Sequence, residues 1–391
     1  MITTMLWSTI LILGILITIH EYGHFKAARS VGVRVEKFSI GIPPRFIVLK
    51  SLDNLIKIKL YFFKWVDNKI KWDVVFEKEL SRPGKVGSNT EYVIALFPIG
   101  GYVKMAGMLD ESMDTNIEYK DDEFMVKPYW AKIWILSAGV LMNVFLAFII
   151  FSSVGYYQGN SEILNEPLIA DLQNDMPAKI SGIQPGDRIS LVNNNKINTW
   201  DDLTSVIHSL PNEKISLIVE RKNELIEFNL TTSSAPIPIE GRIDTIGLIG
   251  ISPEIIYSDI SIFESLNVGY LRTIGTFNMM IMSIKMIGNG SASVSDFGGP
   301  IMIAQLAGQT AEAGWIPFLT FMALISVNLA FINILPIPGL DGGHIFLHSI
   351  EVIIRRPLTL KTRIRIQQIG MSFLLVLMIT VMFNDISRLF N

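Results

Sequence analysis

The sequence predicts a polytopic α-helical membrane protein with four transmembrane helices, a membrane-associated β region on the cytoplasmic side and one external α+β domain. Half of the 391 residues are hydrophobic and only 18% are charged, whereas about 25% are charged in typical soluble domains. The mean hydropathy is +0.41. Four apolar stretches reach the roughly 20 helical residues that cross about 30 Å of hydrocarbon. We therefore do not expect a wholly soluble protein.

The charge balance and the absence of cysteine exclude several function classes. The 33 basic and 36 acidic residues give a net charge of -3, so no surplus of positive charge is present to neutralise a nucleic-acid backbone. We expect no nucleic-acid partner. The chain has no cysteine, which excludes disulfides, cysteine-ligated zinc and thiol nucleophiles. A metal site must be built from the five histidines and the carboxylates.

The four predicted transmembrane helices can be placed by hydropathy and by helix breakers. The first covers 1–30 and is uncharged from Ile2 to His20; it lacks the basic start and the small-residue cleavage site of a signal peptide. The second covers 131–157. The third covers 313–336, where Pro336 must end the helix because proline has no amide donor. The fourth lies in 366–391 with the C-terminus.

The distribution of Lys and Arg predicts the orientation in the membrane. Basic residues gather at 26–50 and at 355–365, and basic loops stay in the cytoplasm. The fifteen residues after Tyr157 and the fifteen before Ala313 contain none. We therefore expect the 337–365 loop to be cytoplasmic, and the central segment and both termini to be external.

The cytoplasmic region 31–130 alternates apolar and polar residues, which is typical of half-buried strands. The segment 56–76 is predicted to form a hairpin that turns at Asp67-Asn68, and 91–105 to form two short strands broken by Pro98 and by Gly100-Gly101. We interpret the hairpin as membrane-associated; a solvated hairpin is the alternative.

The segments between the second and third spans have a different character. Turn signals at 185–188 (Pro-Gly-Asp-Arg) and 193–195 (three Asn) separate short strand-like runs, so 158–258 is predicted to be a compact external α+β domain. In 259–312 apolar residues mix with scattered polar ones. This pattern favours interfacial amphipathic helices over a fifth span.

The sequence His20-Glu21-Tyr22-Gly23-His24 is the main chemical signal. Residues four apart share one helix face, so two imidazoles can hold one zinc ion while Glu21 takes a proton from water. Ionisable residues in a membrane helix are functional candidates by default. The alternative is a set of interfacial polar residues at the end of a span.

Two histidines leave zinc one protein ligand short. Asp341 follows the Pro336 and Pro338 break on the same predicted side of the membrane, and is our candidate for the third ligand. Alternatively, Asp341 only caps a helix that begins near Gly342. His344 and His348 are also four apart, but they lack an intervening Glu, and we interpret them as structural or supporting residues.

Together with the zinc motif, four further stretches resemble the site-2 protease family of intramembrane zinc metalloproteases, especially its bacterial regulator-of-sigma-E group. These are FSIG at 38–41, PIGGYVKM at 98–105, SAGVLMN at 137–143 and NILPIPGLDGGH at 333–344. The resemblance implies that His20, His24 and Asp341 bind Zn²⁺, that Glu21 is the general base, and that Asn333 and Pro336 help to place the substrate. It also implies that the external segment is one PDZ domain.

The chain departs from that family pattern in three places. It has Gly41-Ile42-Pro43 where many members of the group have Gly-Phe-Gly. Its 50–88 segment is longer than the corresponding loop, and its external segment has room for one PDZ domain, where enterobacterial members carry two. We expect a substrate role for the turn at 41–43 to be affected.

The predicted function is hydrolysis of peptide bonds in or near the transmembrane segments of single-span membrane proteins. By resemblance these are anti-sigma-factor-like proteins or signal-peptide remnants, cut in the cell inner membrane by a site near the cytoplasmic face. A transmembrane substrate must unwind to expose its carbonyls, and an edge strand can pair with it. We predict that Gly100, Gly101, Tyr102 and Val103 form this edge; a purely structural hairpin is the alternative. The rival functions are a metal transporter and a non-catalytic PDZ scaffold.

Overall fold

The structure is a computed structural model that describes residues 2–66, 69–108, 118–239, 242–291, 293 and 298–390. The chain divides into two compact units. The first contains 1–154, 269–277 and 295–391, and the second contains 155–268 and 278–294. Each unit is described by itself.

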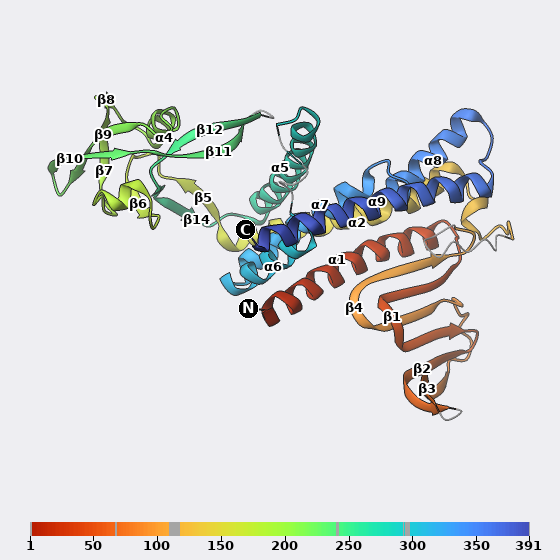
Figure 1. Ribbon diagram of the computed structural model, residues 1–391. Helices are drawn as coiled ribbons and strands as arrows, with labels where there is room; N and C mark the ends of the chain where they lie inside the picture. The colour runs from red at the N-terminus through yellow and green to blue at the C-terminus, as the bar shows by residue number, and fades with distance from the viewer. Residues whose placement is uncertain are drawn as a thin grey trace. The chain divides into compact units, whose positions relative to one another are not determined.

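The described residues form helices and strands in the order labelled in Figure 1. The helices are α1 (Ile2–Ser30), α2 (Tyr129–Gln158), α3 (Pro177–Ile180), α4 (Trp200–His208), α5 (Ile262–Gly288), α6 (Pro300–Ala313), α7 (Trp315–Ile334), α8 (Asp341–Ile354) and α9 (Leu360–Phe390), with a 3-10 turn at Phe124–Val126. The strands are β1 (Val35–Leu52), β2 (Leu55–Val66), β3 (Lys69–Ser81), β4 (Glu91–Met105), β5 (Asn160–Ile163), β6 (Ile169–Leu172), β7 (Arg188–Val192), β8 (Asn195–Lys196), β9 (Lys214–Arg221), β10 (Glu224–Thr231), β11 (Ser233–Ile239), β12 (Arg242–Leu248), β13 (Ile251–Pro253) and β14 (Ile255–Ser258).

Four of the described helices, α1, α2, α7 and α9, are long and apolar enough to cross a membrane. They coincide with the four predicted spans, and α5 is not among them. Two boundaries differ from the prediction. The third span ends at Ile334, two residues before Pro336. The last helix begins at Leu360 instead of 366, because its first turns are basic and a hydropathy argument does not detect them.

The first unit contains a four-stranded sheet in the order β3-β2-β1-β4, beside α1 in Figure 1. Residues 37–40 of β1 each pair with two residues of β4. This part of β1 therefore lies between the two parts of β4, at 91–94 and 101–104. Residues 45–50 pair with the 91–95 part again, and 47–52 also pair with β2. Among the described residues, 101–105 is thus an edge of the sheet.

The pairing in β4 agrees with the two short strands predicted at 91–105. The backbone stays extended through Pro98, so β4 is one strand, but its two parts pair separately, as two short strands would. Gly100, with φ of +106°, takes a left-handed conformation at the bend that favours glycine. The predicted hairpin is confirmed, since β2 and β3 are antiparallel neighbours. The predicted turn at Asp67-Asn68 lies outside the described residues.

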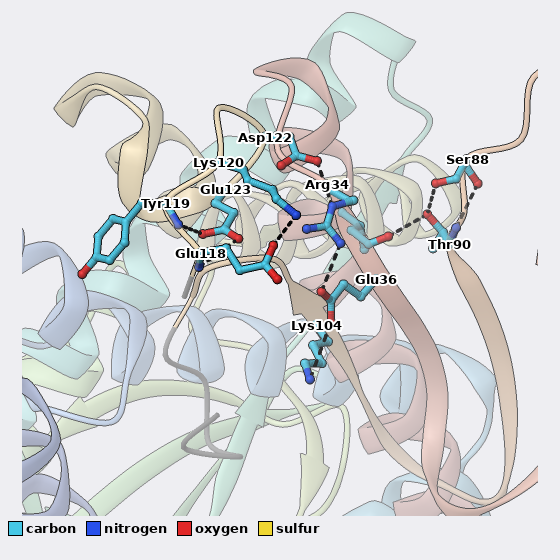
Figure 2. A network of polar contacts seen from close by, with 11 residues as sticks. Arg34, Glu36, Ser88, Thr90, Lys104, Glu118, Tyr119, Lys120, Asp122 and Glu123 are labelled. Atoms are coloured by element: carbon cyan, nitrogen blue, oxygen red, sulfur yellow. Dashed lines mark hydrogen bonds and ion pairs between the residues drawn. The ribbon is translucent and has the colours of Figure 1, made fainter. Parts of the chain in front are cut away.

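A polar network joins the start of β1 to the segment that leads into α2, as Figure 2 shows. The Arg34 guanidinium donates from Nε to Asp122 at 2.8 Å and from Nη1 to Glu36 at 3.3 Å. Glu36 also pairs with Lys104 at 3.6 Å. The buried Thr90 hydroxyl donates to the Val35 carbonyl at 2.8 Å. Of these contacts, the Glu36–Lys104 pair joins β1 to the edge part of β4.

The second unit is an α+β fold with its own apolar core. Its main sheet has the order β10-β9-β7-β8, and α4 begins with a capping box at Thr199 and Asp202. The core residues include Ile189, Leu217 and Leu203. The unit continues past β10, because β13 pairs with β6 and β14 pairs with β5. The last strand of the unit ends at Ser258, and the compact unit itself continues to 268 and includes 278–294.

Candidate metal centre

The helix α1 carries both histidines of the zinc motif on one buried face. His20 and His24 are 7% and 6% exposed, and their Nε2 atoms lie 3.2 Å apart. The imidazole planes are nearly perpendicular. Two nitrogens at this distance need a proton or a cation between them when both present lone pairs, as they do in the tautomers with the proton on Nδ1.

Asp341 is brought to this pair by the start of α8. Its Oδ2 lies 3.1 Å from His20 Nε2 and 3.3 Å from His24 Nε2. The N-cap residue of α8 is Leu340, and no side chain caps the helix. The capping alternative therefore has no support, since the carboxylate faces the histidines.

The three side chains have the geometry of a tetrahedral metal site. Zinc bonds of about 2.0 to 2.1 Å in tetrahedral geometry place the ligand atoms about 3.3 to 3.4 Å apart. The three observed separations, 3.1 to 3.3 Å, are close to this spacing. Among the described residues, His20, His24 and Asp341 are the one group of three or more potential ligands. The donor set of two imidazoles and a carboxylate fits zinc.

Each histidine has a second contact that orients its ring. His24 Nδ1 lies 2.8 Å from the Ile135 carbonyl, so it carries the proton and leaves Nε2 free to bind a metal. The amide of Asn143 lies 3.4 Å from His20 Nδ1. Asn143 is fully buried, and its Oδ1 has no partner. With the amide flipped so that Oδ1 faces His20, the oxygen accepts the Nδ1 proton and leaves Nε2 of His20 free to bind a metal.

Gly139 makes room for the two rings. A Cβ at this position would lie 2.5 Å from His24 Nε2 and 2.8 Å from His20 Nε2, a separation that real side chains do not reach. Sequence reasoning placed the 137–143 stretch in the family resemblance but gave no role to Gly139 or Asn143. Their spacing of four residues on one helix face was the signal available.

The cavity that contains the site has a volume of about 700 Å³. Besides the three candidate ligands, its walls include Glu21, Gly101, Tyr102, Val103, Asn333 and His344. The Val103 backbone N–H interacts with the Glu21 carboxylate. Of the residues predicted to bind substrate, Gly100 and Pro336 are not among those that line the cavity.

His344 and His348 do not form a rival pair of ligands. His344 lines the cavity, whereas His348 Nδ1 lies 2.9 Å from Glu351 Oε2. Burial and the nearby positive charge of Arg363 together outweigh the hydrogen bond to Glu351 and lower the pKa of His348 to about 4. His348 is therefore neutral at pH 7 and acts as a buried hydrogen-bonding group.

Comparison with protein families gives one match that covers most of the chain. The model of peptidase family M50 matches residues 8–63 and 60–377. These ranges contain all three candidate metal ligands and Glu21.

The relatives are similar over nearly their whole length. A Clostridium acetobutylicum protein whose name describes a zinc metalloprotease is 31% identical, over 96% of both chains. The regulator of sigma-E protease RseP of Escherichia coli is 28% identical over 98% of both chains. The regulator of sigma-W protease RasP of Bacillus subtilis is 27% identical over 97% of this chain and 98% of its own.

Solved structures match a smaller part of the chain. The PDZ domain of an SdrC-like protein from Listeria monocytogenes covers 24% of this chain and 90% of its own, with 16% identity and a TM-score of 0.19.

Proposed function

The chain belongs to peptidase family M50 and is a metalloprotease, and from this premise we propose that it cuts single-span membrane proteins at a zinc site in α1 and α8. The observation that carries the proposal is the triangle of His20, His24 and Asp341 around one point, with Glu21 in the same cavity. A transporter or a scaffold does not require this carboxylate next to the ligand set.

The proposed mechanism assigns a task to each side chain. His20, His24 and Asp341 would hold zinc, which when bound polarises the scissile carbonyl and makes water more acidic. Glu21 accepts the proton of the attacking water and delivers it to the leaving amide nitrogen. Asn143 and the Ile135 carbonyl keep the imidazoles in the orientation that leaves their Nε2 atoms free.

We propose that the edge of β4 at Gly101 to Val103 binds the unwound substrate as an added strand. The edge lines the cavity beside Glu21, and an extended segment can add to the edge of a sheet as a further strand. The Val103 N–H that points at Glu21 would be close to the scissile bond. Asn333, whose Nδ2 lies 3.5 Å from His20 Nε2, would contact the substrate backbone.

The proposed location is the cell inner membrane, with both termini external and the site near the cytoplasmic face. The support is the clustering of Lys and Arg at 26–50 and 355–365. We also propose that α5 and α6 lie at the interface and that the β2–β3 hairpin touches the membrane. Phe63, Trp65 and Ile70 at its far end are 61%, 71% and 59% exposed, which suits an interface.

We propose that the second unit is a single PDZ domain that selects substrates before they unwind. Its support is the α+β fold with one main sheet and the helix α4. Anti-sigma-factor-like proteins and signal-peptide remnants are the proposed substrate classes, by analogy with the named activity of the sigma-E and sigma-W relatives.

The test is cleavage of a one-span reporter by the chain and by Glu21→Gln, with zinc content measured on both proteins. We expect Glu21→Gln to keep stoichiometric zinc and to lose cleavage at least 100-fold, since an amide cannot accept the proton. Asp341→Ala should lose both zinc and cleavage. Near wild-type cleavage by zinc-loaded Glu21→Gln would refute the assignment of the base.

A further inference from the structure

A second cavity of about 360 Å³ lies among the first turn of α2, the C-terminal end of α8 and the start of α9. Its walls carry four cationic side chains, Lys132, Arg355, Arg356 and Arg363, and one acidic side chain, Glu351. The formal charge of the lining is therefore 4 minus 1, or +3. The proposed hydrolysis does not use any of these residues.

The single carboxylate is already occupied by protein groups. Glu351 accepts hydrogen bonds from the Leu358 backbone N–H at 2.6 Å, from His348 at 2.9 Å and from Arg363. Among the residues that the structure describes, Lys132, Arg355 and Arg356 form no ion pair within 4 Å, and Lys132 Nζ lies 5.9 Å from the centre of the Phe124 ring. Their charge is thus available to an anion in the cavity.

The position of the cavity indicates where that anion comes from. Two candidate membrane spans begin at its walls, α2 at Tyr129 and α9 at Leu360. In the proposed membrane orientation, the cavity would therefore lie where hydrocarbon gives way to water. Tyr129 and Trp130 are 41% and 65% exposed there, as is typical of an interfacial aromatic belt. At this level the headgroups of the lipids would be the nearest anions.

We propose that this cavity binds the phosphate of an anionic phospholipid such as phosphatidylglycerol. A phosphate diester carries one negative charge, and guanidinium groups donate two parallel hydrogen bonds to it. Apolar walls at Met125, Val352 and Leu360 suit the glycerol and the first acyl carbons. Basic pockets between transmembrane helices on the cytoplasmic side are known to hold anionic headgroups.

Native mass spectrometry of the detergent-solubilised full chain, titrated with phosphatidylglycerol, tests the proposal. The test variant is Lys132→Gln with Arg356→Gln. The matched control is Lys361→Gln with Arg365→Gln, which removes two exposed charges from the first turns of α9 without touching the cavity walls. Zinc content of each protein reports on its fold.

We expect the wild type and the control to bind one phosphatidylglycerol with equal affinity. The test variant should bind it at least ten times more weakly. Phosphatidylcholine should bind at least ten times more weakly than phosphatidylglycerol to the wild type. Equal loss in both double variants would overturn the proposal in favour of diffuse surface attraction. Glycerol phosphate binding as tightly as phosphatidylglycerol would overturn the lipid source and indicate a soluble phosphate ligand.

Discussion

At the scale of single residues, the proposed chemistry depends on how closely two helices approach at the histidine pair. His20 and His24 lie against Gly139 of α2, and Asn143 lies one turn further along the same helix. Neither residue of α2 is a candidate ligand. They would affect metal binding indirectly, because Gly139 leaves room for the two rings and Asn143 orients the imidazole of His20.

Gly139→Ala should remove metal binding without unfolding α2. The added methyl group would meet His24 Nε2 at 2.5 Å, so the ring would have to leave the position in which it faces His20 and Asp341. Zinc content of the purified variant should fall at least tenfold. Gly275→Ala is the matched control, since a Cβ there meets nothing within 4 Å. A zinc-loaded and active Gly139→Ala protein would contradict the tight approach.

Asn143→Ala should weaken zinc binding by about 10- to 100-fold, the range found when supporting partners of metal ligands are removed. The His20 Nδ1 proton would lose its acceptor, and the ring could turn away. Asn143→Asp should restore binding because a carboxylate also accepts that proton. Competition with a chelator measures the affinity. If Asp and Ala variants bind zinc equally weakly, Asn143 acts by packing alone.

At the scale of elements, a buried ion pair ties β7 to β9 in the second unit. The Asp187 carboxylate is 1% exposed and accepts from Arg221 Nε at 2.6 Å and Nη2 at 2.7 Å. The Gln184 backbone N–H donates to it at 2.9 Å. Burial alone would raise the pKa of Asp187, but these donors outweigh it and lower the pKa below its usual value.

Asp187→Asn should destabilise the second unit by about 1.5 to 3 kcal/mol at pH 7, the range for hydrogen bonds to charged groups, because the Arg221 side chain that is left without its partner is partly exposed. A lowered pKa in the folded state gives stability that is complete above the unfolded value of about 3.9 and is lost as pH falls through the folded value. The difference from wild type should therefore shrink below about pH 4.

Thermal unfolding of the full chain, monitored by the protease sensitivity of the second unit at each temperature, measures this effect across pH. The exposed Asp259 provides the control, and Asp259→Asn should match wild type at every pH. A deficit in Asp187→Asn that stays constant down to pH 2 would show that the carboxylate charge is not what stabilises the pair.

At the scale of the whole molecule, the strand-containing part of the second unit can be removed at a natural junction. Its strands begin at Asn160 and end at Ser258, and the two ends are neighbours, since a Cβ on Gly159 would lie 2.3 Å from the Ser258 carbonyl oxygen. A deletion confined to 162–236 would leave β13 and β14 without the partners β6 and β5. Deleting 160–258 with a short flexible linker removes complete pairs.

This deletion should leave cleavage of a pre-trimmed substrate within about threefold of wild type and admit some untrimmed substrate. The reason is that the proposed ligands and Glu21 all belong to the first unit. Cleavage of both reporters, with zinc content as the check of folding, gives the result. A folded, zinc-loaded deletion protein that cuts neither reporter would show that the second unit is needed for catalysis.

The sequence by itself determined the features that depend on neighbours along the chain. Spans follow from hydropathy summed over a helix, the β2–β3 hairpin from alternation, and the shared face of His20 and His24 from a spacing of four. These properties are local, so they do not depend on how distant parts of the chain pack. The end of α7 before Pro336 was equally local. The start of α9 was missed because its basic first turns carry no hydropathy signal.

Only the tertiary structure decided what distant segments do to each other. It brought Asp341 within 3.3 Å of both histidines, gave Gly139 its role as the space for two rings, and placed the first part of β1 between the two parts of β4. It also gathered Lys132 and Arg356 around one cavity. Such arrangements depend on which helix faces pack together. The free energy of that packing comes from contacts between segments that are far apart in the sequence, and a local sequence pattern does not contain it.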